Sequence, residues 1–162
     1  IYSSLSVRRG SDTNYIRVLD VEPKPWNSFF DEAPLQGRLR VVSLRHHPPP
    51  QFAALSYCRG KPNKSRPYTI ELRAKGRYRA KLNITENCRN ALCDLRQRRR
   101  PLTIWVDSIC ISQSDIEEMQ MQIPLMGSIY LLVAVVYVWL GKDYYFFYDR
   151  IMYIKVAAYQ WN

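Results

Sequence analysis

The sequence is poor in glycine and histidine, and its cysteines follow no metal-binding pattern. It contains 6 glycines in 162 residues, none in the spacing of a phosphate-binding loop, which excludes glycine-rich nucleotide motifs. The histidines are the adjacent His46 and His47, so Ser56 has no evident base that would make it a nucleophile. Cys88 and Cys93 do not complete a zinc-ligand pattern with the other two cysteines. We therefore expect neither a metal nor a bound cofactor.

Acidic residues are also scarce relative to basic ones. The chain has 14 Asp or Glu against 24 Lys or Arg, a net charge of +10. This balance favours acidic partners such as nucleic acid, anionic membranes or phosphorylated ligands. Nucleic acid could bind Arg98, Arg99 and Arg100 together with a basic hairpin that carries Tyr68 and Tyr78. A solvated basic surface is the commoner explanation, so a nucleic-acid-binding domain is the alternative hypothesis.

The composition is that of one globular domain in a reducing compartment. With 162 residues, 47% apolar and 23% charged, the chain can form one hydrophobic core and is too apolar to be disordered. Its start lacks the charged and apolar regions of a secretory leader. Cys58 and Cys110 lie in apolar runs typical of buried strands, so we expect reduced thiols and a cytoplasmic protein.

One long uncharged stretch raises the question of a membrane span. Residues 123–140 are largely apolar and reach the length of a transmembrane helix. Gln120, Gln122 and Pro124 argue against a span. From residue 133 onwards, β-branched and aromatic residues replace the helical spacing, as in a strand buried on both faces. We expect a helix followed by a strand, and no membrane attachment.

Hydrophobic periodicity predicts strands that alternate with helices. Strands are expected at residues 15–20, 39–44, 52–57, 102–107 and 133–140, and a β-hairpin at residues 68–72 and 78–82. From residue 52 the order is strand, hairpin, helix, strand, helix, strand. Such an order is typical of an α/β fold with a parallel sheet and right-handed crossovers.

Two helices lie between these strands. Thr85 is expected to cap the first, whose apolar face consists of Cys88, Ala91, Leu92 and Leu95. Ser114 and Glu117 form a capping box for the second, which Pro124 kinks or restarts. The apolar face predicted for this second helix consists of Ile116, Met119, Ile123, Met126 and Tyr130.

Four ordered sequence blocks resemble the heterokaryon-incompatibility (HET) domain of filamentous fungi. Residues 52–60, FAALSYCRG, resemble the family block YxALSYVWG. Residues 104–113, IWVDSICISQ, with Asp115 and Glu118, resemble LWIDAICINQxDxxER. Residues 122–130 and 138–141 resemble QVxLMxxIY and VWLG. One block alone would be weak, but the ordered series is specific and, with a weaker match near residue 15, covers residues 15–141.

The resemblance implies a fold and a role. HET domains resemble TIR domains, which implies a flavodoxin-like, mostly parallel sheet flanked by helices, with the β-hairpin as an insertion. The implied role is that of a cell-death effector in self/non-self recognition, acting by regulated assembly with a recognition or signalling protein or with itself. Some TIR domains cleave NAD without a metal, using a helix-borne Glu that stabilises the sugar cation, so NAD is a possible substrate here.

Carboxylates of the second block are the candidate catalytic residues. Glu118 and Asp107 are the two that we consider, and Asp115 lies beside them in the motif. Each has a simpler interpretation. Glu118 would complement the helix dipole as a first-turn acid, and Asp107 would accept backbone hydrogen bonds in a turn.

Four further motif residues are expected near these carboxylates. Ser56 and Tyr57 end the other motif strand and would lie near Asp107 if the two strands are neighbours. Gln113 follows in the second block, and Cys110 is more simply a buried small hydrophobe than a reactive thiol.

Three departures from the family pattern bear on activity. Arg59 replaces a Trp, Ser112 an Asn and Met119 an Arg, which leaves open a catalytically inactive interaction module. We divide the chain into a frayed lead (residues 1–14), a HET domain (15–141) and an unassigned tail (142–162).

Overall fold

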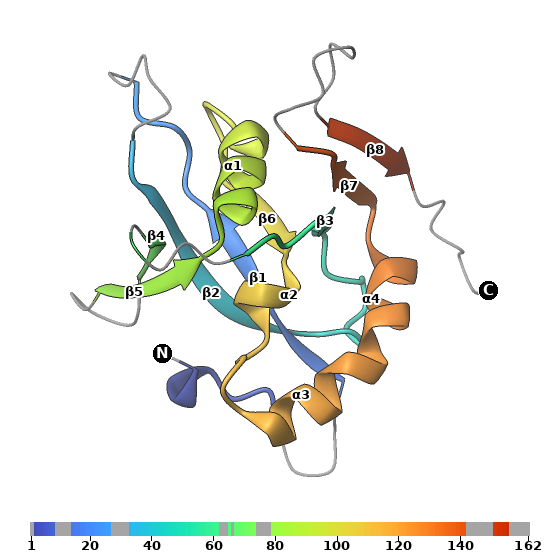
Figure 1. Cartoon of the computed structure of the whole chain (residues 1–162). Coiled ribbons are helices and arrows are strands. Elements are labelled where there is room, and N and C mark those ends of the chain that lie inside the picture. Colours follow the sequence, from blue (N-terminus) through green and yellow to red (C-terminus); the bar gives the residue numbers. More distant parts are fainter. Residues whose placement is uncertain are drawn as a thin grey trace.

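The computed structural model describes residues 2–8, 14–26, 33–61, 65, 67–73, 79–141 and 151–155. Within them, eight strands form one sheet in the order β5-β4-β2-β1-β6-β3-β7-β8, with helices packed beside it (Figure 1). The strands are β1 (Tyr15–Val21), β2 (Leu35–Ser43), β3 (Ala53–Tyr57), β4 (Tyr68–Arg73), β5 (Arg79–Ile84), β6 (Leu102–Trp105), β7 (Val135–Trp139) and β8 (Ile151–Lys155).

The sheet is mixed, which corrects the expectation of a mostly parallel sheet. The α/β class is confirmed, and β6, β3 and β7 are parallel neighbours as the strand-helix-strand order predicts. However, β1 pairs antiparallel with both β2 and β6, and β7 pairs antiparallel with β8. A parallel pair needs a long crossover connection and an antiparallel pair does not, so strands outside the alternating segment were free to add in the other direction.

The hairpin is confirmed, but it extends the main sheet. β4 and β5 pair antiparallel, and β4 also runs parallel to β2. Tyr78 lies outside the described residues. Within this part of the sheet, a side chain at Gly37 would place its Cβ 2.8 Å from Asp20 O, so the close approach of β2 to β1 requires glycine.

Helix α1 (Glu86–Leu95) forms as its sequence predicts. The Thr85 side chain accepts a hydrogen bond from Cys88 N, and Cys88, Ala91 and Leu92 are fully buried. Arg96 ends the helix and donates to the backbone carbonyl of Glu22 (2.7 Å), which ties α1 to the loop after β1.

The second helical region is broken into pieces. It consists of α2 (Asp107–Cys110), α3 (Ile116–Gln122), a 3-10 turn η2 (Ile123–Leu125) and α4 (Met126–Leu132). Pro124 accounts for the break between α3 and α4. The expected helix followed by a strand is therefore present, and among the described residues no helix is long and apolar enough to cross a membrane.

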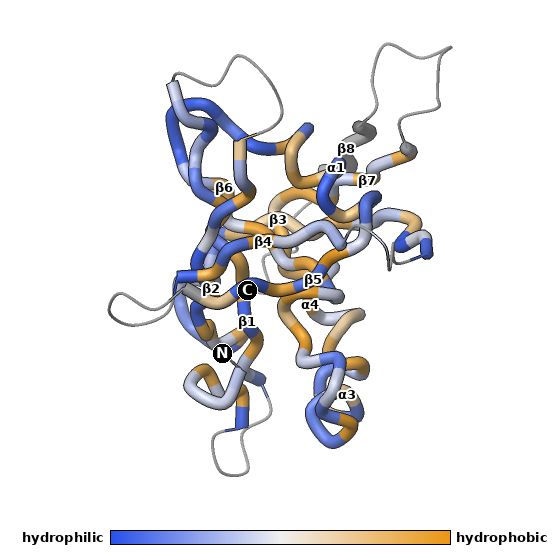
Figure 2. The backbone as a smooth tube through the Cα atoms, turned by 60° about the vertical axis from the view of Figure 1, so that its left-hand side comes forward, coloured by the Kyte–Doolittle hydropathy of each residue, from blue (hydrophilic) through white to orange (hydrophobic). Residues whose placement is uncertain are grey.

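Two predictions about α3 were wrong. Its N-cap is Asp115, whose side chain accepts from Glu118 N, and not Ser114. Its predicted apolar face is only partly correct, because Met119, Met126 and Tyr130 pack against the core but Ile116 and Ile123 are 67% and 56% exposed. The inward residues are Glu118 and Gln122, 5% and 1% exposed, in a helix that Figure 2 shows to be largely hydrophilic. The physical reason is a buried charge on β1 that only a carboxylate can neutralise.

The chain before β1 is packed onto the body, which corrects the expectation of a frayed lead for the described part. Residues 2–8, hereafter the N-terminal strap, contain a 3-10 turn η1 (Ser3–Leu5) and lie beside α3 (Figure 1). Val7 within the strap is 1% exposed. At the other end, β8 brings part of the expected tail into the sheet; the rest of that tail lies outside the described residues.

Candidate functional site

A buried ion pair joins β1 to α3. Arg17 is 1% exposed and Glu118 is 5% exposed. Two parallel contacts connect them: Arg17 Nη1 donates to Glu118 Oε1 (2.5 Å) and Nη2 donates to Oε2 (2.8 Å). This two-pronged geometry gives an arginine–carboxylate pair its strongest and most directional form.

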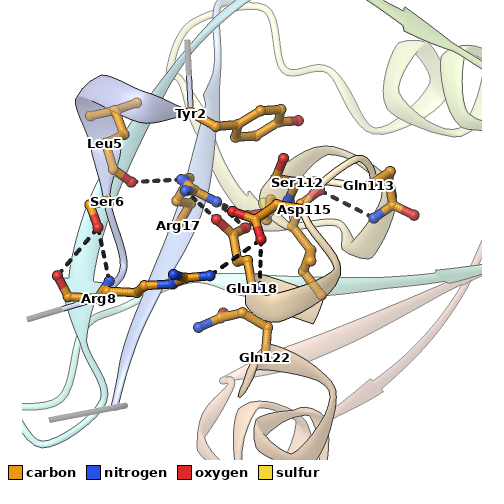
Figure 3. A network of polar contacts seen from close by, with 12 residues as sticks. Tyr2, Leu5, Ser6, Arg8, Arg17, Ser112, Gln113, Asp115, Glu118 and Gln122 are labelled. Carbon is orange, nitrogen blue, oxygen red and sulfur yellow. Dashed lines mark hydrogen bonds and ion pairs between the residues drawn. The ribbon is translucent and has the colours of Figure 1, made fainter. Parts of the chain in front are cut away.

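The remaining polar atoms of the pair are also occupied (Figure 3). Arg17 donates through Nε to Leu5 O (2.8 Å) and through Nη1 to Cys110 O (3.1 Å). Ser112 N donates to Glu118 Oε1 (2.7 Å). Burial alone raises the pKa of Glu118, but the hydrogen bonds from Arg17 and Ser112 outweigh it and hold that pKa below its ordinary value. Glu118 is thus ionised and fully engaged by the protein. Arg17, Glu118 and their partners are hereafter the ion-pair site.

A second polar group lies where β3 and β6 end. Its members, hereafter the strand-edge cluster, are Tyr57, Arg59, Cys88, Asp107, Ser108 and Gln113. Asp107 is the first residue of α2, two positions beyond β6, and not the end of the strand as predicted. Its Oδ2 accepts from Arg59 Nη2 (2.6 Å), and its Oδ1 accepts from Ser108 N (2.7 Å). Gln113 donates to Asp107 O (3.1 Å) and accepts from Arg59.

The inner part of the strand-edge cluster consists of hydroxyl and thiol groups. The Tyr57 hydroxyl and Ser108 Oγ are 2.8 Å apart, and Cys88 Sγ lies 3.9 Å from Ser108 Oγ. Burial raises the pKa of Tyr57 above its ordinary range and that of Cys88 to about 11. These groups therefore stay protonated at neutral pH, and neither is an activated nucleophile.

The structure brings most of the predicted site residues together, in two groups. Parallel pairing of β3 with β6 places Tyr57 beside Asp107, as expected. Ser56 pairs in register with Val138 of β7. Asp115 belongs to the ion-pair site, where it caps α3.

Cys110 connects the two groups and is inert. It is 1% exposed, and burial raises its pKa to about 12, in agreement with a small hydrophobe. Cys58, predicted to be buried, is exposed because β3 ends one residue before it. Arg98, Arg99 and Arg100 are exposed after α1 and belong to neither group.

A pocket of about 430 Å³ adjoins the ion-pair site. The strap forms one wall with Tyr2, Ser3, Ser6 and Arg8, and the body forms the other with Arg17, Ser112, Ser114, Asp115 and Glu118. Its lining combines hydroxyl groups with charges of both signs. Among the described residues, no group of three or more His, Cys, Asp or Glu side chains is placed to hold a metal ion.

Reasoning from sequence missed the partners of Glu118. Arg17 is flanked by Ile16 and Val18, both fully buried, and a charge inside such a strand is a signal for a buried ion pair. Tyr2 and Arg8 gave no comparable signal, because they lie in a short polar segment whose docking depends on tertiary contacts.

Most residues of these two clusters lie within a match to a known domain family. Residues 52–152 match the family model described as heterokaryon incompatibility protein (HET). This match covers more than half of the chain and includes the whole strand-edge cluster and Glu118. The chain therefore belongs to the HET family.

A curated relative carries a name from the same family. The chain is 33% identical over 147 residues, 87% of its length, to heterokaryon incompatibility protein 6, OR allele, from Neurospora crassa. It covers 21% of that relative, about a fifth of the larger protein. No solved structure matches the chain.

Proposed function

We propose that the chain is a cytoplasmic cell-death module of fungal heterokaryon incompatibility, and that it acts by assembly with itself or with a recognition protein. Membership of the HET family and the name of the Neurospora crassa relative support the biological role. Assembly as the mode of action is supported by the state of the motif carboxylates.

The observation that carries this proposal is that both oxygens of each of the two candidate catalytic carboxylates accept hydrogen bonds from the protein. Asp107 accepts from Arg59 and from Ser108 N. Glu118 accepts from Arg17 and from Ser112 N. Each of these contacts takes up a lone pair that a general base or a cation-stabilising carboxylate would direct at the substrate. Glu118, locked to a buried arginine, supports the fold, which favours the exposed surfaces as the carriers of the function.

Helix α3 and the segment after it offer such a surface. Ile116, Ile123 and Leu131 are 67%, 56% and 68% exposed, on elements that the family motif covers. Large exposed apolar side chains along one helical segment are typical of protein contact sites.

The test is forced assembly in a fungal host. The 162-residue chain is fused to an oligomerising tag and induced, and colony viability is measured. We expect the fusion to kill, and Ile123→Asp with Leu131→Asp to abolish killing at unchanged protein abundance. Gln120→Asp, which also adds a charge to α3, is the matched control and should kill. Normal growth with the wild-type fusion, while a related HET domain kills, would refute the role.

NAD cleavage is the second candidate, because the 430 Å³ pocket adjoins Glu118. It requires Arg17 to release an oxygen of Glu118, and a TIR-like activity would then follow from the helix-borne carboxylate. Cellular NAD, measured in the same induction, separates the two candidates. Killing without loss of NAD supports assembly alone, whereas a loss that precedes death would make the chain an enzyme.

A further inference from the structure

The N-terminal strap is held at its inner end by three kinds of contact. The Tyr2 hydroxyl donates to Ile109 O (2.8 Å). The Arg17 guanidinium lies over the Tyr2 ring, with Arg17 Cζ 4.8 Å from the centroid of that ring. Leu5 O accepts from Arg17 Nε (2.8 Å). Val7 is 1% exposed. The body therefore presents a shaped surface that recognises an aromatic hydroxyl, a backbone carbonyl and a small apolar side chain.

Among the described residues, the side chain of Arg8 at the outer end of the strap contacts the body through exposed ion pairs. Arg8 contacts Asp115 (3.3 Å) and Glu117 (2.8 Å) at the start of α3. The Arg8 side chain is 42% exposed, and those of Asp115 and Glu117 are 45% and 78% exposed. Ion pairs this exposed are screened by water and salt and contribute little stability. This end can therefore detach at low cost.

The strap fills its binding surface incompletely. The pocket of about 430 Å³ lies between the strap and the body (Figure 3), with Ser3 and Ser6 on one side and Ser112 and Ser114 on the other. The pocket opens to solvent, so a segment with larger side chains at these positions has room to extend into it and to make contacts with the body that the strap does not make.

The ion pair does not depend on the strap for its neutrality. If the strap leaves, Arg17 keeps both contacts to Glu118 and its bond to Cys110 O. Leaving one partner of a buried ion pair alone is what makes such pairs costly to disturb. Removal of the strap exposes a complete, preformed surface and leaves no buried charge unpaired.

We propose that this surface, formed by β1, α2 and the start of α3, is a peptide-docking site that the strap occupies as a displaceable intramolecular ligand. The partner is a protein segment that carries an aromatic residue with a hydroxyl group and, beyond a small apolar residue, an arginine or lysine. The basic residue faces Asp115 and Glu117, a local acidic pair on a chain of net charge +10. This inference goes beyond the proposed function and stands without it, since it concerns binding and not cell death.

The test measures whether the strap competes with a peptide of its own sequence. The probe is a fluorescent peptide of residues 2–8 with blocked ends, which removes terminal charges, titrated with the 162-residue chain and followed by anisotropy. Arg8→Glu in the chain weakens the docking of its own strap, because it replaces two ion pairs with repulsion from Asp115 and Glu117. We expect this variant to bind the peptide on the order of tenfold more tightly than the wild-type chain, because two exposed ion pairs no longer hold the competitor.

Two matched changes make the result specific. A peptide that carries Arg8→Glu should bind both chains more weakly than the wild-type peptide does. Adding Glu117→Arg to the Arg8→Glu chain should restore the internal contact and repel the wild-type peptide, so affinity falls again. Equal affinity of the wild-type and Arg8→Glu chains, or equal binding of both peptides, would overturn the proposal. Arg8→Ala replaces Arg8→Glu if circular dichroism shows that the latter is unfolded.

Discussion

Asp107 and Glu118 come from one sequence block but occupy opposite environments. Glu118 is 5% exposed and locked to an equally buried arginine. Asp107 has a side chain that is 32% exposed, paired with Arg59 at 48%. Water screens the second pair and is excluded from the first, so the same chemical contact has very different energetic weight. The ion-pair site holds the fold together, whereas the strand-edge cluster can change without endangering it.

The largest effect should come from breaking the buried pair on one side only. Arg17→Met leaves the Glu118 carboxylate buried without its partner, and Glu118→Gln leaves the guanidinium of Arg17 in the same state. Each should lower the free energy of unfolding by about 3–5 kcal/mol, a large part of the stability of a typical domain. Urea denaturation followed by circular dichroism measures the loss.

The double variant tests whether the charge itself is responsible. Arg17→Met with Glu118→Gln removes both charges, while the Gln can still accept from Ser112 N. We expect it to lose clearly less stability than the sum of the two single variants. If the losses of unfolding free energy were strictly additive, Arg17 and Glu118 would contribute independently. The ion-pair site would then not differ in this respect from the strand-edge cluster.

The second largest effect should be a loss of folding stability in acid, which protonates Glu118 in the ion-pair site. The pKa of Glu118 is lower in the folded protein than in the unfolded chain, so its contribution to stability is complete above the unfolded value, about 4.3. That contribution is lost as the pH falls through the lower, folded value. The urea midpoint of the wild type should therefore fall steeply below about pH 4.3. Glu118→Gln lacks this component, and an equally steep fall in that variant would contradict the assignment.

The elements were largely predictable from local patterns, but the polar interior was not. Thr85 at the start of α1 and the buried Cys88, Ala91 and Leu92 follow directly from helical spacing and capping. The parallel centre of the sheet follows from the alternation of strands and helices. The antiparallel pairing of β1 with β6 does not, since it joins segments about half the chain apart and no local signal encodes it.

The site shows the same limit at the level of single residues. The pattern of α3 assigned Ile116 and Ile123 to the core and Glu118 to the helix dipole. In the structure, Arg17 on β1 needs a carboxylate, and this demand turns Glu118 and Gln122 inwards. The burial cost of an unpaired charge exceeds the gain from covering two isoleucines, but only the tertiary arrangement brings the arginine to the helix. The meeting of Tyr57 with the Asp107 turn was predicted on the condition that the two motif strands are neighbours, and the pairing of β3 with β6 meets that condition.

The smallest effect should come from the strand-edge cluster. Asp107→Asn removes the charge that pairs with Arg59 but keeps an oxygen that can accept from Ser108 N. Because the Arg59 pair is exposed, we expect a loss of no more than about 1 kcal/mol, and less at high salt. The measurement is urea denaturation at low and high ionic strength, beside Glu118→Gln under the same conditions.

Arg59 gives this prediction its control. Arg59→Gln removes the other half of the exposed pair, so it should match Asp107→Asn in size and in salt dependence, and the double variant should lose little more than either. If Asp107→Asn instead cost as much as Glu118→Gln, the charge of Asp107 would stabilise the fold by more than its exposed pair with Arg59. The strand edge would then be as structural as the ion-pair site, and activity would have to be sought on the exposed face of α3 and α4.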